Sequence, residues 1–84
     1  MTNAELIERI STFVNEIRSH KGLDAIAVGG TTSLLDGDSG FDSLDLAALV
    51  VDLQSATDYD PFHAGFIDFT TAGELATLFA REVK

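Results

Sequence analysis

Three segments of the chain are predicted to be helices: the first and last carry apolar side chains every three or four positions, which is the spacing of one face of an α-helix, and the middle one is an almost unbroken apolar stretch. They span about residues 2–21, 43–57 and 70–83. A chain of 84 residues that is mostly helical can form only a small bundle, and folding buries only about 60–65% of the surface of a chain this size. We therefore predict a single all-α domain over residues 1–84 with no room for a large internal cavity.

The predicted helices have recognisable ends. Thr2-Asn3-Ala4-Glu5 is a Thr-x-x-Glu capping sequence, and a second one lies in Thr70-Thr71-Ala72-Gly73-Glu74. Gly22 suits the position just beyond the end of the first helix. Asp42 is the natural N-cap of the middle helix, because its carboxylate can accept hydrogen bonds from the first free N–H groups.

The segments between the helices also make predictions. Residues 23–42 shift to Gly, Thr, Ser and Asp, and a loop this long is usually functional or held by apolar anchors. The candidate anchors are Ile26, Val28, Leu34, Leu35 and Phe41. Asp58-Tyr59-Asp60-Pro61 should end the middle helix, and a short helical turn is expected at about 62–66. The predicted architecture is thus a four-helix bundle with three main helices and one short one.

The middle helix is unusually apolar. At about 100° per residue, its polar face is confined to Asp45, Asp52 and Ser55, with Ala48 between them. Almost every other position must be buried or lie on a binding surface.

Charge is distributed unevenly along the chain. The formal net charge is −9, and from Gly22 to Ala80 there is no Lys or Arg but ten of the fourteen acidic residues. Such a surface argues against nucleic acid and anionic membranes as partners, and favours partner proteins with basic patches. Repulsion among unpaired acids also predicts that salt or divalent cations stabilise the domain. The 45% of hydrophobic residues nevertheless excludes a disordered chain.

Other sequence features narrow the setting. There is no cysteine, so disulfides and thiolate metal sites are excluded. No apolar run approaches the roughly 18 residues of a membrane span, and the N-terminus lacks the pattern of a signal peptide. We expect a monomeric, cytoplasmic protein.

The segment Gly40-Phe41-Asp42-Ser43-Leu44-Asp45 places one hydroxyl at the start of the apolar middle helix, among carboxylates. Phosphate groups favour the same position, because free N–H groups and the positive end of the helix dipole meet there. This segment resembles the signature of the acyl carrier proteins, and the order of the predicted helices resembles that family over nearly the whole chain. The resemblance implies that Ser43 carries a 4'-phosphopantetheine arm, donated from coenzyme A by a separate phosphopantetheinyl transferase.

The resemblance further implies a non-enzymatic carrier, whose acyl or aminoacyl cargo is held as a thioester on the arm. Asp42 would approach the metal-bound coenzyme A in the transferase complex, and Leu44 would flank the attachment site. Loading ligases and biosynthetic enzymes with basic patches would dock on a surface that includes Asp38, Asp45, Ala48 and Asp52. The residues expected to line any shelter for an apolar cargo are Leu44, Leu46, Leu49, Val50 and Phe69.

The middle helix departs from carriers of bulk fatty acid synthesis, because Ala47, Ala48 and Val51 stand where acids are expected. This departure suggests a specialised pathway with a more apolar contact. The sequence leaves open whether the pathway makes fatty acids, polyketides or other lipids, or transfers aminoacyl groups.

Two alternatives remain open. Residues 36–45 are rich in Asp and faintly resemble a calcium loop of a dockerin-like interaction module, although position six of an EF-type loop starting at Asp36 is Phe41 rather than Gly. A hydrolase using Ser43 and His63 is the other alternative, although so small a fold offers little pocket or oxyanion hole. Neither His20 nor His63 argues for a metal site, and we expect both on the surface.

Overall fold

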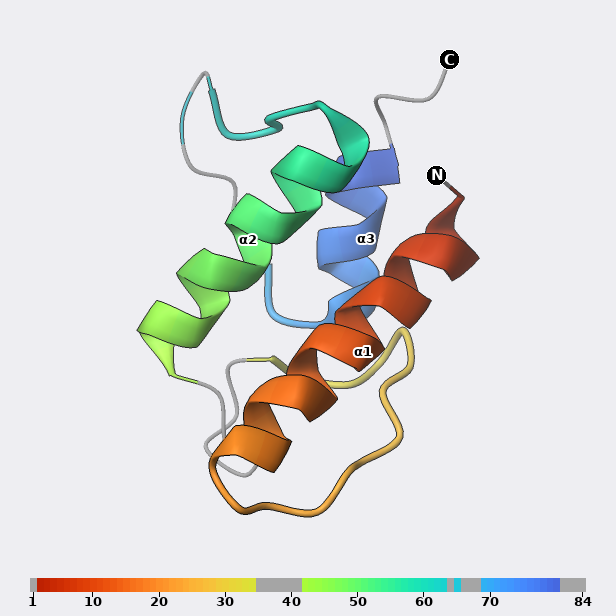
Figure 1. Ribbon diagram of the computed structural model, residues 1–84. Coiled ribbons are helices and arrows are strands. Elements are labelled where there is room, and N and C mark those ends of the chain that lie inside the picture. Colours follow the sequence, from red (N-terminus) through yellow and green to blue (C-terminus); the bar gives the residue numbers. More distant parts are fainter. Residues whose placement is uncertain (1, 35–41, 64, 66–68, 81–84) are drawn as a thin grey trace.

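The computed structural model describes residues 2–34, 42–63, 65 and 69–80. Within these ranges the chain forms three helices, α1 (Asn3–His20), α2 (Ser43–Thr57) and α3 (Ala72–Ala80), and each helix contacts the other two (Figure 1). The same ranges contain no strand, only one isolated antiparallel bridge between Ser33 and Thr71. The predicted all-α fold is therefore confirmed for these ranges, with the three main helices of the predicted bundle present.

Both ends of α1 follow the sequence prediction. The Glu5 N–H donates to the Thr2 hydroxyl at 3.2 Å, and the Thr2 N–H donates to the Glu5 carboxylate at 2.8 Å, which completes the capping box. At the other end Gly22 has a φ of 78°, a conformation that suits glycine. The Leu23 N–H donates to the Arg18 carbonyl at 2.8 Å, so the last turn closes as a Schellman motif.

The start of α3 combines a local cap with a long-range one. The Glu74 N–H donates to the Thr71 hydroxyl at 3.1 Å, and the Glu74 carboxylate accepts from the Thr71 N–H at 3.0 Å, as the capping sequence predicts. The next free donors are satisfied by the loop that follows α1. The Ala72 N–H donates to the Thr32 carbonyl and the Gly73 N–H to the Gly30 carbonyl, each at 2.9 Å. The loop thus caps α3 with its own backbone.

The same loop is tied to α1 by side chains. Asn15 donates to the Ile26 carbonyl at 3.0 Å and accepts from the Ile26 N–H at 2.8 Å, while Arg18 Nε donates to the Asp24 carbonyl at 2.6 Å. Among the predicted apolar anchors, Leu34 is buried, Ile26 and Val28 are partly buried, and Leu35 and Phe41 lie outside the described residues. Polar clamps as well as apolar anchors therefore hold the loop.

One apolar core joins the three helices. Its buried members are Leu6, Ile10, Val14, Leu34, Leu49, Leu53, Phe69, Ala72, Leu75, Ala76 and Phe79. Phe62 packs edge-on against Phe79 with ring centroids 6.3 Å apart, which brings the segment after α2 onto this core. Within the described ranges, no helix combines the length and apolarity needed to cross a bilayer.

The chain leaves α2 through a turn built on Asp60. Asp58 ends the helix in the left-handed conformation with a φ of 55°, and the Asp60 carboxylate accepts from the Phe62 N–H at 2.9 Å. Residues 61–63 form turns, and the rest of the predicted short helix at 62–66 lies partly outside the described residues. The predicted extension of the last helix from Ala80 to Val83 also lies outside them.

Candidate functional site

The candidate site begins at the first turn of α2. Asp42 is the N-cap, and its carboxylate accepts from the Asp45 N–H at 2.9 Å, as predicted. The Asp45 carboxylate also accepts from the Asp42 N–H at 3.2 Å, which makes an Asp-x-x-Asp capping box that the sequence analysis missed. Ser43, the predicted attachment residue, is the first residue of the helix.

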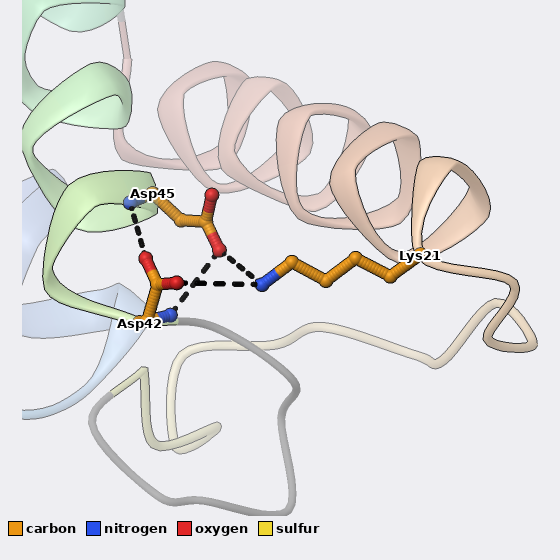
Figure 2. A network of polar contacts seen from close by, with 3 residues as sticks. All are labelled: Lys21, Asp42 and Asp45. Carbon is orange, nitrogen blue, oxygen red and sulfur yellow. Dashed lines mark hydrogen bonds and ion pairs between the residues drawn. The ribbon is translucent and has the colours of Figure 1, made fainter.

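Lys21 joins the two carboxylates of this capping box (Figure 2). It is the C-cap residue of α1, and its Nζ lies 2.5 Å from Asp45 Oδ2 and 3.8 Å from Asp42 Oδ2. The hydrogen bond from Lys21 is the main cause that lowers the pKa of Asp45, and the same bond raises the pKa of Lys21. The end of α1 is thus fixed to the start of α2 beside Ser43.

A second ion pair joins the same two helices one turn before the end of α2. Arg9 binds Asp52 in a bidentate manner, with Nε to Oδ2 at 2.8 Å and Nη2 to Oδ1 at 3.1 Å. Asp45 and Asp52, the two acids of the predicted docking surface on α2, are therefore each paired with a cation from α1 or its C-cap. The expectation that these acids are unpaired is wrong, because they lie on the edge of α2 that faces α1.

The exposed face of α2 is apolar. Leu44 is 79% exposed and Val51 62% exposed, and Ala47 and Ala48 are exposed between them. We call these four residues the α2 ridge; helical spacing places them on one stripe. The polar positions predicted for this helix, Asp45, Asp52 and Ser55, lie next to the ridge, and Asp45 and Asp52 are on its α1 side.

An apolar hollow of about 450 Å³ opens beside the ridge, between α2 and the segment around Phe62. Its lining residues are Leu46, Ala47, Val50, Val51, Gln54, Asp60, Phe62 and Phe69. Three of the five residues predicted to line a shelter are among them. Leu49 is fully buried in the core instead, and Leu44 is exposed on the ridge, because their places on the helix direct them away from the hollow.

The remaining predicted residues are placed as follows. Asp38 and most of the calcium-loop segment lie outside the described residues. His20 and His63 are exposed, as expected, and His63 Nδ1 lies 3.2 Å from the Asp60 carbonyl oxygen. In the part of the chain that the structure describes, no group of three or more His, Asp or Glu side chains is placed to hold a metal ion.

Comparison of the chain with protein-family models, with curated proteins and with solved structures gives no match. The chemistry of the site must therefore be inferred from its own arrangement. A phosphate ester on the first residue of a helix lies at the positive end of the helix dipole, near N–H groups that lack intrahelical partners. The site combines that position with an exposed apolar ridge and an apolar hollow one turn further along α2.

Proposed function

We propose that the protein is a freestanding acyl carrier protein, with a 4'-phosphopantetheine arm from coenzyme A attached to Ser43. The protein is not itself an enzyme in this proposal. It holds an acyl or aminoacyl group as a thioester on the thiol of the arm. Tethering raises the effective concentration of that group at each enzyme that docks the carrier.

One observation carries the proposal: Ser43 is the first residue of a helix whose N-cap is fixed by Asp45 and Lys21. A fixed helix start gives a transferase a defined target, and an attached phosphate gains from the helix dipole. Leu44, the next residue, is 79% exposed, as suits a side chain that a partner protein contacts.

The apolar hollow supports the acyl form of this proposal. Leu46, Val50 and Phe69 line it, and its volume of about 450 Å³ falls within the range of small-molecule sites. An apolar cargo on a flexible arm could shelter there between visits to partner enzymes. A charged or strongly polar cargo would lose its hydration in the hollow and should remain in solvent.

The proposal also specifies the rest of the fold and the partners. It implies a four-helix bundle of the carrier type, whose short fourth helix would fall between α2 and α3 in the segment 62–66, which lies partly outside the described residues. The partners are a phosphopantetheinyl transferase, a loading ligase and the downstream enzymes of a specialised pathway.

The decisive experiment incubates the protein with coenzyme A, Mg²⁺ and a broad-specificity phosphopantetheinyl transferase and then measures intact mass. The proposal predicts one added phosphopantetheine group on the wild type and none on Ser43→Ala. Ser55→Ala is the matched control, because it removes another serine of α2 and should leave the addition unchanged. Absence of any addition to a folded wild-type protein would refute the proposed function.

A further inference from the structure

The two ion pairs on α2 leave Asp45 and Asp52 with little uncompensated negative charge. The Asp45 side chain is only 16% exposed beneath Lys21, and Asp52 is 29% exposed with both carboxylate oxygens bound to Arg9. Between and beyond these pairs the face consists of the α2 ridge, Leu44, Ala47, Ala48 and Val51. The α2 ridge is therefore apolar and bordered by two acids that are paired with cations, while the Asp42 side chain, 62% exposed, lies at the start of the helix.

We propose that the α2 ridge binds partner proteins that present an apolar contact surface in preference to partners that present a basic one. Lys21 and Arg9 cause this preference, because they neutralise Asp45 and Asp52 from within the same chain. This inference rests on the proposed carrier function and names the chemistry of the partner at that site. It replaces the expectation that basic patches provide the main attraction.

Charge complementarity supports this choice of partner. A basic partner would have to displace Lys21 and Arg9 or bring its own cations close to theirs, and like charges across an interface are unfavourable. An apolar surface meets no such opposition, because the exposed side chains of Leu44 and Val51 gain from leaving water. The ion pairs can remain intact at the rim of the contact.

A second copy of this chain fits the ridge poorly. Each copy has a formal net charge of −9, so two copies repel each other. The ridge has four residues, whereas a stable interface takes about 20–30 residues from each side. The ridge suits a small, short-lived contact with a partner, which needs less area than a stable dimer.

The transferase reaction provides a probe of the ridge. We would measure kcat/KM for modification of Ser43 at about 0.02 M and about 0.5 M NaCl. Val51→Ser should lower kcat/KM roughly fivefold at both salt concentrations, since it removes exposed apolar surface that the contact buries. Leu23→Ser is the matched control, because Leu23 is also exposed but lies outside the ridge, and its kcat/KM should match the wild type.

The counter-ions are tested by Lys21→Gln in the same assay. This variant leaves the carboxylates of Asp42 and Asp45 without their cation, so a basic surface on the transferase should attract them at low salt. The ratio of kcat/KM at low salt to kcat/KM at high salt should therefore be at least about threefold larger than in the wild type. Lys21→Arg should restore the wild-type ratio, and Lys84→Gln should keep it while removing the same charge at the last position of the sequence. Circular dichroism confirms that each variant is folded.

Three results would overturn the inference. The first is a Lys21→Gln salt ratio equal to that of Lys84→Gln, and the second is a Val51→Ser rate equal to that of Leu23→Ser. The third is a dimer seen by light scattering that Val51→Ser abolishes, since a second copy would then occupy the ridge. Each can occur while Ser43 is modified to completion, so failure of this inference is distinct from failure of the carrier function.

Discussion

Replacing Gly73 by alanine should destabilise the protein, although alanine is the better helix former. Gly73 lies in the first turn of α3, where its N–H donates to the Gly30 carbonyl at 2.9 Å. A Cβ at this position would lie 2.5 Å from the Gly30 oxygen and 3.0 Å from the Gly30 Cα. Both neighbours are backbone atoms, so no side-chain rotation can relieve the contact.

The magnitude follows from these distances. Ordinary contacts between such atoms begin at about 3.5 Å, so the loop would have to retreat by roughly 0.5–1 Å. That shift lengthens the Gly73–Gly30 hydrogen bond beyond its usual range and disturbs the cap on α3. Overpacking costs about 1–3 kcal/mol, and alanine in a helix returns about 0.5–1 kcal/mol. We expect the free energy of unfolding to fall by roughly 1–2 kcal/mol.

Urea unfolding followed by circular dichroism measures this change. Heating should show the same effect, at roughly 4–8 °C in Tm for each kcal/mol in a domain of this size. Gly29→Ala is the control, because a Cβ at Gly29 meets no atom within 4 Å, and it should change the free energy of unfolding by less than about 0.5 kcal/mol. A Gly73→Ala protein as stable as Gly29→Ala would refute the close approach of the loop to α3.

Three further predictions use the same protein. Asp42→Asn should keep the N-cap of α2 and yet slow phosphopantetheine transfer to Ser43. Asp42→Ala should slow the transfer and also lower the free energy of unfolding in urea by about 1 kcal/mol. Equal transfer rates for Asp42→Asn and the wild type would show that the Asp42 carboxylate has no role in the transfer. Asn15→Ala should cost about 1–3 kcal/mol, because it leaves the Ile26 N–H and carbonyl without their partner, and wild-type stability would contradict that clamp. The free energy of unfolding should fall as the pH drops below about 4, because Asp45, Glu5 and Glu74 have a lower pKa in the folded state than in the unfolded state. Asp45→Asn should make this fall with decreasing pH smaller than in the wild type. The same dependence of stability on pH in both proteins would argue against the Lys21–Asp45 contact.

Helix ends were predictable from the sequence because their signals are local. The Thr2–Glu5 and Thr71–Glu74 boxes, the Asp42 N-cap and Gly22 each act within a few residues of a helix end, and all are present in the structure. Such signals need no knowledge of how the helices pack.

The partners of the charged residues could not be predicted, because they depend on packing. Lys21 and Asp45 are 24 positions apart, and Arg9 and Asp52 are 43 apart. Arg9 and Lys21 reach these acids only because α1 packs against α2. The capping of α3 by the loop at 29–34 escaped prediction for the same reason, since backbone acceptors carry no sequence signal.

The carrier function requires one phosphopantetheine group on Ser43, and the most direct test is to locate that group within the chain. Trypsin is unsuitable, because no Lys or Arg occurs between Gly22 and Ala80. Cleavage before aspartate releases Asp42-Ser43-Leu44 and separates it from Ser39 on one side and Ser55 on the other. After incubation with coenzyme A and the transferase, we expect the added mass on this short peptide alone. An added mass on a peptide that contains Ser39 or Ser55, or on none, would contradict it.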